Sequence, residues 1–400
     1  MTSAVSGASD PKFAAVKEEF ERNFAERGEV GASVCLSVNG ETLVDLWGGM
    51  ANPETNDPWR EDTISIVFSC SKAATALCAH ILIDRGELNP EALVSEYWPE
   101  FARNGKEKTT VRMMLNHESA LPTLRDPVRP GGFTDWDYMI QRLEDEEAFW
   151  EPGTRNGYHM INFGWTVGEL VRRVSGKSLG TFFREEVAEK TGARFWLGLP
   201  ESEDVHIAPI IPYAPKPDDQ PTEFAIKLLT DPDSIQHKSF MNNGGWDFND
   251  RKSQAAEIGG GGGLSNARGQ VAMYTPLATN DGTLVSHDRL QAMSMVTTAT
   301  QRDATLLIPT RFGPGFMKSM DNRALNAGPG TSVIMGDRAF GHVGAGGSIG
   351  FADPEAGLAF SYTMNQMGSG ILVNDRAQSL IDAAYRSLGY RTNAPGVWVK

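Results

Sequence analysis

An almost unbroken run of apolar residues extends from Ala73 to Ile83, directly after the tetrapeptide Ser69-Cys70-Ser71-Lys72. A helix that has no polar face is a buried helix, so this pattern predicts one buried helix here. The run ends at Arg85-Gly86, where a cation followed by glycine is typical of a helix C-terminus. The sequence therefore predicts that Ser69 and Lys72 lie at the N-terminus of a buried helix.

Amphipathic and alternating patterns at both ends of the chain predict two helices and several strands. Apolar positions at helical spacing predict helices over residues 10–27 and about 375–388, the first capped by Asp10 and followed by Gly28. Two β-rich runs joined by Asn39-Gly40 are typical of a hairpin. The expected strands cover residues 30–38, 42–47, 338–345, 348–352 and 358–364.

The middle of the chain has a different pattern, in which short helical segments alternate with Pro- and Gly-rich loops. The expected helices cover residues 110–117, 134–146, 160–175, 178–189 and 266–278, whereas residues 199–262 are expected to form long loops over a pocket. The predicted fold class is α/β (α+β): an antiparallel sheet built from both termini and flanked by the terminal helices, with a mostly helical insertion. We assign residues 1–89 and 306–400 to the sheet domain and residues 90–305 to the inserted domain, with a site at the seam.

The composition narrows the possible partners and compartments. The chain has 400 residues, 22% of them charged, and a net charge of −14, so nucleic acid and anionic membranes are not expected as partners. The N-terminal residues lack the pattern of a signal peptide, and the three cysteines Cys35, Cys70 and Cys78 form no cluster, so we expect a cytoplasmic protein with reduced thiols. The seven histidines show no zinc spacing, and neither a metal nor another cofactor is expected.

The spacing of Ser69 and Lys72 is that of a nucleophile and its base. Residues three apart lie on the same face of a helix, one turn from each other. Burial disfavours the ammonium form and lowers the lysine pKa, so the amine can take a proton from the serine hydroxyl. Either this pair is catalytic, or the motif is one of the chance S-x-x-K matches that occur in chains of this length.

Tyr158 is a second candidate, because it follows the turn Glu151-Pro152-Gly153 and precedes a helix. A tyrosine at such a position can pass protons to and from a serine oxygen if a nearby ammonium lowers its pKa. The alternative is a tyrosine that only packs its ring and forms a local hydrogen bond.

The stretch from Gly341 to Ser348 is a third candidate, because glycines in a strand permit close approach to the backbone. The backbone N–H groups of Ala345 and Ser69 are expected to form an oxyanion hole, and His342 is expected to offer a donor at the pocket wall, unless it is a structural histidine. Ser348 also lies in a G-x-S-x-G match, but a strand and a turn follow it where that motif requires a helix. The five glycines at 259–263 lack the Lys-Ser/Thr of a phosphate loop and are expected to form a flexible turn that lines the pocket.

Three motifs in this order resemble those of the serine β-lactamase and penicillin-binding superfamily, in particular its class C-like branch that includes family VIII carboxylesterases. They are Ser69-x-x-Lys72, Tyr158 after a Pro-Gly turn, and His342-Val343-Gly344. The stretch from Leu115 to Pro122 also resembles that branch, with Ala120 where glycine is usual. The resemblance implies a nucleophilic Ser69, activation shared by Lys72 and Tyr158, an oxyanion held by the amides of Ser69 and Ala345, and a strand motif matched by His342 and Gly344.

Two departures from the family pattern bear on the substrate. Met160 stands where the family often has the asparagine of Tyr-x-Asn, and it cannot reproduce the hydrogen bonds of an amide. His342 replaces the lysine of Lys-Thr-Gly and offers less fixed charge to a substrate carboxylate. Both changes favour neutral esters over β-lactams and peptides.

The sequence therefore predicts a serine carboxylesterase that acts through an acyl-enzyme on short-chain or small esters, with a small-molecule ester as its partner. The alternatives on the same site are a β-lactamase, a D-amino-acid peptidase or amidase, and an acyltransferase. A catalytically silent binding protein is the alternative of a different class.

Overall fold

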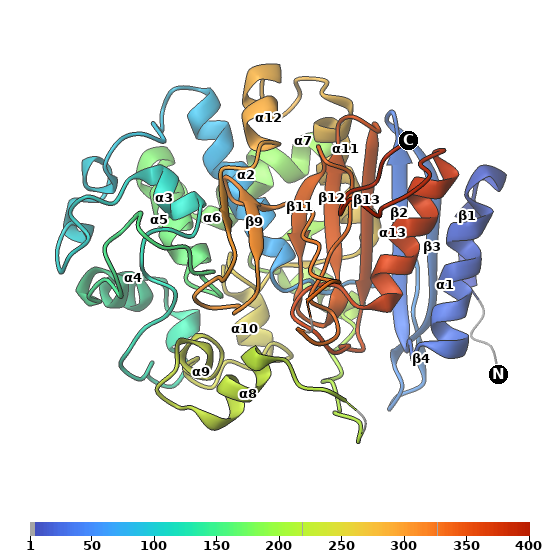
Figure 1. The fold of residues 1–400 in the computed structure, drawn as a ribbon, viewed down its shortest axis with the longest axis horizontal. Coiled ribbons are helices and arrows are strands. Elements are labelled where there is room, and N and C mark those ends of the chain that lie inside the picture. The colour runs from blue at the N-terminus through green and yellow to red at the C-terminus, as the bar shows by residue number, and fades with distance from the viewer. Residues whose placement is uncertain (1–4, 218, 326) are drawn as a thin grey trace.

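The computed structural model describes residues 5–217, 219–325 and 327–400, and its centre is one large antiparallel sheet (Figure 1). The strand order is β1-β3-β2-β13-β12-β11-β10-β9-β8, and β4 pairs with β3. The strands are β1 (Val5–Ser9), β2 (Gly31–Val38), β3 (Glu41–Asn52), β4 (Asp57–Pro58), β8 (Thr298–Thr300), β9 (Thr310–Gly313), β10 (Phe316–Met317), β11 (Phe340–Val343), β12 (Ile349–Asp353) and β13 (Leu358–Met364). This sheet and its helices confirm the predicted fold class.

The two ends of the chain meet in the middle of the sheet. The hairpin of β2 and β3 turns at Asn39 and Gly40, which both have positive φ, as the two-residue turn requires. On its other side β2 pairs with β13, so that Leu36 lies opposite Phe360. Seven of the eight β2 residues are buried, because helices cover both faces of the sheet at this point.

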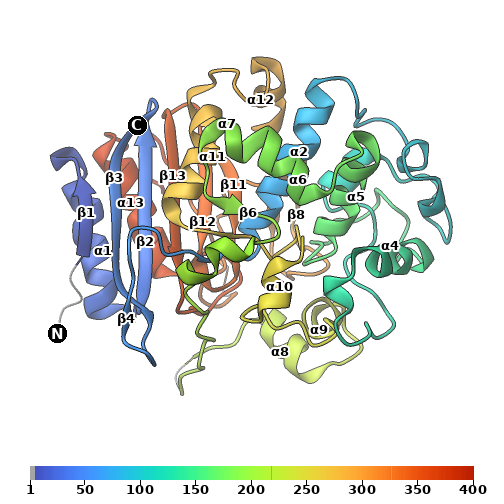
Figure 2. The same ribbon diagram turned by 180° about the vertical axis from the view of Figure 1, so that it is seen from behind.

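Helices form a layer on each face of the sheet. Helices α1 (Ala14–Glu26) and α13 (Asp375–Ser387) pack together on one face, in front in Figure 1, and α11 (Ala267–Thr279) packs on the other, in front in Figure 2. The predicted first helix begins with a 3-10 turn, Pro11–Phe13, where the Asp10 side chain accepts a hydrogen bond from the Lys12 amide. Strand β1, which pairs with β3, was not predicted from the sequence.

The remaining helices form the part of the molecule beside the sheet. They are α2 (Cys70–Asp84), α3 (Val111–Leu115), α4 (Trp136–Asp145), α5 (Phe163–Ser175), α6 (Leu179–Phe183), α7 (Glu189–Thr191), α8 (Glu223–Thr230), α9 (Ile235–Met241), α10 (Arg251–Ala255) and α12 (His287–Met293). A small second sheet has the order β5-β7-β6, with β5 at Ser65–Ile66, β7 at Leu264–Ser265 and β6 at Phe195–Trp196. None of the helices in the described ranges is long and apolar enough to cross a membrane.

The middle of the chain contains more helix than the sequence indicated. Residues 199–262, which we expected to form long loops, contain the short helices α8, α9 and α10, so that expectation was wrong in part. The domain boundaries at 89/90 and 305/306 stay a prediction, although α11 and β8, which lie between them, belong with the sheet.

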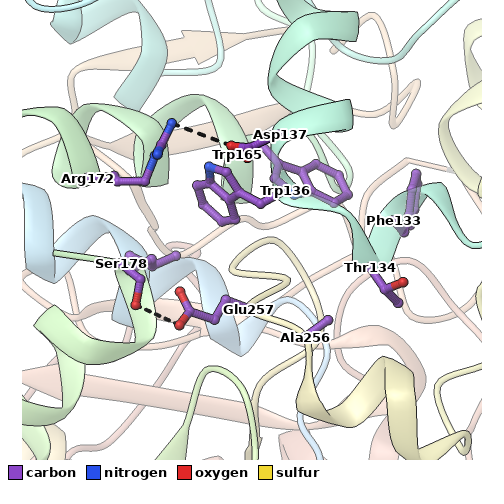
Figure 3. Close-up of a pocket in the computed structure, with 10 residues that line it drawn as sticks. Phe133, Thr134, Trp136, Asp137, Trp165, Arg172, Ser178, Ala256 and Glu257 are labelled. Atoms are coloured by element: carbon purple, nitrogen blue, oxygen red, sulfur yellow. Dashed lines mark hydrogen bonds and ion pairs between the residues drawn. The ribbon is translucent and has the colours of Figure 1, made fainter.

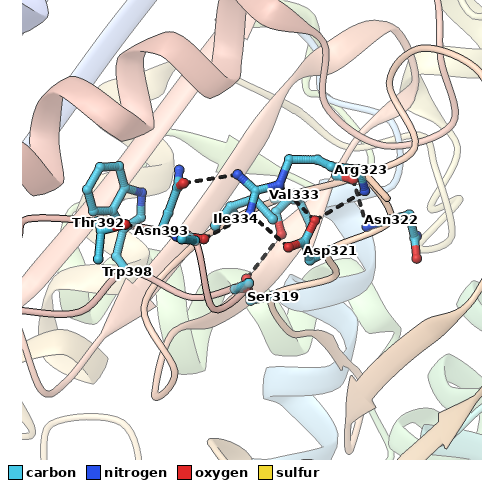
Figure 4. Close-up of polar contacts among 12 residues, drawn as sticks. Ser319, Asp321, Asn322, Arg323, Val333, Ile334, Thr392, Asn393 and Trp398 are labelled. Atoms are coloured by element: carbon cyan, nitrogen blue, oxygen red, sulfur yellow. Dashed lines mark hydrogen bonds and ion pairs between the residues drawn. The ribbon is translucent and has the colours of Figure 1, made fainter. Parts of the chain in front are cut away.

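Polar contacts fasten the C-terminal segment to the edge of the fold (Figure 4). The Arg323 guanidinium donates to the side chain and to the carbonyl oxygen of Asn393, at 2.9 and 2.8 Å, and is paired with Asp321. The Ser319 hydroxyl donates to the Gly396 carbonyl at 2.8 Å. These contacts hold the end of the chain beyond α13 in one place.

Candidate active site

Ser69 and Lys72 lie together at the N-terminus of α2, as the sequence predicts. Ser69 is the N-cap residue of the helix, and 13 of the 15 helix residues are buried. Lys72 is fully buried, and its Nζ lies 2.8 Å from the Ser69 Oγ. Helical spacing thus places the hydroxyl and the amine on the same face of α2, one turn apart.

Two backbone carbonyl groups accept hydrogen bonds from the buried Lys72 amine. The Lys72 Nζ donates to the carbonyl oxygens of Met160, at 2.6 Å, and Gly260, at 2.5 Å. Burial lowers the pKa of Lys72 well below its usual value, which favours the neutral form of the amine over the ammonium. A neutral amine has two hydrogens and one lone pair. In this structure Nζ also donates to the Ser69 Oγ; in the neutral amine the two carbonyls would hold both hydrogens and leave the lone pair for the Ser69 hydroxyl.

The run of glycines at 259–263 supplies one of those carbonyls and differs from the expected role. Its residues are buried and do not line the cavity at Ser69. Gly260 packs against Gly164 of α5 so closely that a Cβ on Gly164 would lie 2.1 Å from the Gly260 nitrogen. Thr75 Oγ1 also donates to the Gly259 carbonyl, at 2.9 Å. The glycines therefore permit a close approach that sets the Gly260 oxygen against Lys72.

Tyr158 faces the same pair, but the condition set for its proton transfer, a lowered pKa, is not met. Its ring centroid lies 4.9 Å from the Lys72 Nζ. Burial raises the pKa of the Tyr158 hydroxyl, and a hydrogen bond with Ser69 opposes this only in part. A nearby ammonium would lower that pKa, but burial of Lys72 disfavours its ammonium form. Tyr158 is therefore a phenol that can donate a proton.

Asp303 positions Tyr158. The sequence did not indicate this role. Its buried carboxylate accepts hydrogen bonds from the backbone amide of Tyr158, at 3.0 and 3.1 Å, and from the amides of Thr305 and Leu306, both at 2.8 Å. Asp303 lies 145 positions from Tyr158 and in no recognisable motif, so only the folded chain brings the two together.

His342 lies behind Tyr158, and not at the pocket wall where it was expected. It is 2% exposed, is not among the residues that line the cavity, and its ring centroid lies 5.9 Å from that of Tyr158. Burial lowers the pKa of His342 to about 3, and Nδ1 lies 2.7 Å from the Val343 carbonyl oxygen. Burial also lowers the pKa of His117, whose ring centroid lies 4.8 Å from that of Tyr158, so the imidazoles that pack against Tyr158 are neutral.

The backbone near Ala345 completes the site. Strand β11 ends at Val343, so Ala345 lies in a 3-10 turn, Ala345–Gly347, and not in the strand as expected. Ser69, Met160, Gly344 and Ala345 all line one cavity. Within the described residues the amides of Ser69 and Ala345 have no hydrogen-bond acceptor, so both are free for an oxyanion.

Phe68, the residue before the candidate nucleophile, has a φ of +46°, which is uncommon for a bulky side chain. Such a conformation costs roughly 1–2 kcal/mol. Its ring packs edge-on against Phe248, with centroids 5.3 Å apart. The sharp bend at Phe68 lets α2 start directly after Ser69, its N-cap residue. Nothing in the sequence pattern predicted it.

Ser348 is not placed as a nucleophile. Its side chain is buried, and its Oγ lies 3.2 Å from the Val67 carbonyl oxygen and 4.0 Å from the Cys70 sulfur. Strand β12 follows it, whereas the G-x-S-x-G motif requires a helix.

The cavity at Ser69 is distinguished from the other cavities by the residues that line it. The cavity at Ser69 has a volume of about 460 Å³ and mostly apolar walls. A second one, of about 270 Å³, lies beside α4 and α5, where Arg172 is paired with Asp137 and Ser178 with Glu257 (Figure 3). The second cavity contains none of the candidate catalytic residues, so the cavity at Ser69 is the candidate active site.

A family model described as "Beta-lactamase" matches residues 18–384. The chain belongs to the beta-lactamase family. This confirms the resemblance seen in the sequence. Among similar members of the family, the esterase/beta-lactamase LipL of Mycobacterium tuberculosis is 33% identical over 93% of this chain and 86% of its own. A family VIII carboxylesterase structure is 36% identical, with a TM-score of 0.81 over 96% of this chain and all of its own. A penicillin-binding protein homologue from Caulobacter crescentus is 32% identical, with a TM-score of 0.84 over the same shares.

Proposed function

We propose that the chain is a serine carboxylesterase that hydrolyses small, uncharged carboxylic esters through an acyl-enzyme on Ser69. The observation that carries the proposal is the buried amine of Lys72, whose Nζ lies 2.8 Å from the Ser69 Oγ and whose pKa burial lowers, so that its neutral form can take the hydroxyl hydrogen. Relatives named as esterases, among them LipL and EstB of Burkholderia gladioli, support the same chemistry.

The proposed acylation follows from the positions of four groups. The Ser69 oxygen attacks the ester carbonyl carbon while its proton passes to Lys72. The amides of Ser69 and Ala345 hold the oxyanion that forms. The C–O bond to the alcohol then breaks, and the departing oxygen receives a proton from the Tyr158 phenol, which Lys72 reprotonates in turn.

Deacylation reverses the proton transfers. A water molecule takes the place of the alcohol and gives a proton to the Tyr158–Lys72 pair as its oxygen attacks the acyl carbon. The Ser69 oxygen leaves as the tetrahedral intermediate collapses, recovers its proton, and the carboxylic acid departs. No other group is needed, because the same pair serves as base and then as acid.

The proposed preference for uncharged esters rests on Met160 and His342. Met160 lines the cavity with a thioether, which cannot make the two-way hydrogen bonds of an amide side chain. His342 is neutral and buried, so it gives no cation to a substrate carboxylate. A β-lactamase is the second candidate, because LipL also carries that name. A cytoplasmic location and a small-molecule ester as the partner remain parts of the proposal.

The test uses 4-nitrophenyl acetate, nitrocefin and an aryl phosphonate with the wild type and Ser69→Ala. We expect ester turnover above cephalosporin turnover, a phosphonate adduct mapped to Ser69, and a loss on the order of 10³-fold or more in the variant. An adduct on Ser348, or unchanged turnover in Ser69→Ala, would contradict the proposal. Faster hydrolysis of nitrocefin than of the acetate would favour the β-lactamase.

A further inference from the structure

Helix α8 combines an apolar sequence with an exposed position. Five of its eight residues, in the sequence EFAIKLLT, are apolar, yet none of the eight is buried. Leu229 is 76% exposed, and Phe240 on the adjacent helix α9 is 42% exposed. Large apolar side chains gathered on a surface mark a place where an apolar group binds.

One face of α8 borders the cavity that contains Ser69. Phe224, Ala225, Leu228 and Leu229 line that cavity together with Phe240 of α9. Their spacing places the four α8 residues on one side of the helix. Ile226 is 47% exposed but does not line the cavity. The exposed apolar rim at Leu229 and Phe240 is thus continuous with the apolar wall that leads to the nucleophile.

The rim is attached to the segment that positions Tyr158. Gln236 of α9 is buried, and its Nε2 donates to the carbonyl oxygens of Ala304 and Thr305, at 2.9 and 2.7 Å. Both residues belong to the turn that Asp303 holds against the Tyr158 amide. Asn242, directly after α9, donates to the carbonyl oxygens of Leu124 and Asp126. The rim therefore has a fixed place relative to the reacting groups.

The charged groups in the cavity wall do not favour a charged substrate. Lys216 and Asp219 are the only residues of fixed charge among those described that line it. The Asp219 carboxylate already accepts hydrogen bonds from the Tyr213 hydroxyl and the Lys216 amide, at 2.5 and 2.6 Å. The rest of the path from Ser69 to Leu229 offers mainly hydrocarbon contacts.

We propose that this cavity takes esters with a long, unbranched hydrocarbon chain, which runs from Ser69 along α8 and leaves across Leu229 and Phe240. The proposal rests on the proposed esterase function and widens its substrates from small esters to long-chain ones. Each methylene that moves from water to this wall strengthens binding in the transition state as well as the ground state, so kcat/KM increases with chain length.

The test compares 4-nitrophenyl acetate, butyrate and octanoate, all below their solubility limits, with Leu229→Ser, Phe240→Ser and Ile226→Ser. In the wild type we expect kcat/KM to increase from acetate to octanoate. Leu229→Ser and Phe240→Ser should each lower the octanoate/acetate ratio of kcat/KM by about tenfold. Ile226→Ser is the matched control, because it removes an exposed apolar side chain from the same helix outside the cavity, and it should leave the ratio unchanged.

Each result separates the inference from the function on which it rests. Turnover of acetate that depends on Ser69, without an increase toward octanoate, overturns the long-chain proposal and leaves the esterase intact. An equal decrease of the ratio in all three variants also overturns it, because the effect would then be one of general surface hydrophobicity. No turnover of any ester overturns both proposals.

Discussion

The Nζ of Lys72 lies 2.8 Å from the Oγ of Ser69, and both belong to the first turn of the buried helix α2. Because the nucleophile and its base share one rigid element, their relative position follows mainly from the helix itself. The Nζ also donates to the carbonyls of Met160 and Gly260, which come from separate segments and add to the constraint on the amine.

Replacing the amine should abolish activation of the serine. We expect Lys72→Met to lower kcat/KM by about 10³-fold or more, and Lys72→Arg to do the same, because a guanidinium cannot be deprotonated to accept a proton. Both are measured with 4-nitrophenyl acetate. Lys106→Met is the matched control: Lys106 is also buried and also donates to two carbonyls, those of Glu144 and Glu146. It should cost stability but not activity, and equal losses of activity in all three variants would contradict a role for Lys72 as base.

The pH dependence of kcat/KM should reflect Lys72 and not a histidine. Burial holds the pKa of Lys72 well below its usual value. Because protonation removes the lone pair, the rate should fall as the pH drops through that lowered pKa. On the alkaline side the raised pKa of Tyr158 should leave the rate level beyond pH 10. A rate profile from pH 5 to 10.5 checks this, and a fall between pH 8 and 10 would argue against a protonated Tyr158.

Tyr158→Phe should lower kcat by about 10²- to 10⁴-fold, the usual contribution of a positioned general acid. KM for the acetate ester should change little, since the ring remains. Tyr213→Phe serves as the comparison, because Tyr213 lines the same cavity but its hydroxyl donates to Asp219. If steady-state kinetics show the same decrease of kcat in both variants, the hydroxyl of Tyr158 does not act as the general acid.

Asp303→Asn tests whether the carboxylate positions Tyr158. The Asp303 oxygens accept hydrogen bonds from three backbone amides. In asparagine one of the two oxygens is replaced by an NH2 group, which would face a backbone N–H and could not accept its hydrogen bond. We expect a lower kcat with the same pH profile, and a free energy of unfolding reduced by about 1–3 kcal/mol. Asp353→Asn is the matched control, because the Asp353 side chain also accepts hydrogen bonds from two backbone amides, those of Glu355 and Ala356, but lies away from the site. It should lower stability alone, and a loss of kcat in both would point to a general structural effect.

The free energy of unfolding should decrease in mild acid, because buried histidines bind a proton less readily in the folded chain than in the unfolded chain. Burial lowers the pKa of His80 from 6.5 to about 3, so below pH 6.5 the unfolded chain binds a proton that the folded chain does not. At pH 5 this one residue should cost about 2 kcal/mol relative to pH 7. In urea unfolding at both pH values His80→Gln should reduce the difference, whereas His287→Gln, at an exposed histidine, should not. Equal pH dependence in His80→Gln and the wild type would contradict the burial argument.

The sequence predicted what depends on local spacing. The pairing of Ser69 with Lys72 follows from helical periodicity, and the β2–β3 hairpin follows from Asn39-Gly40. The family motifs also placed Tyr158 in the same cavity as Ser69, although they are distant in the sequence.

Features that depend on distant contacts or on the depth of burial could not be predicted. The carboxylate of Asp303, the bend at Phe68 and the Gly260 carbonyl meet their partners only in the folded chain. The direction of the Tyr158 pKa shift could not be predicted, because it depends on how deeply the ring is buried. Helix α8 was not predicted, because its apolar residues do not pack into the protein core.

Strand β13 (Leu358–Met364) pairs with β2 (Gly31–Val38), so neighbours in the centre of the sheet come from opposite ends of the chain. During synthesis on a ribosome the first hairpin emerges long before its partner strand exists. Contacts between such remote segments form slowly, because a very long loop must close first. The last strands also carry Ala345 into place, so an unfinished chain holds Ser69 and Lys72 but no complete oxyanion hole. Activity should therefore arise only when nearly the whole polypeptide has been released.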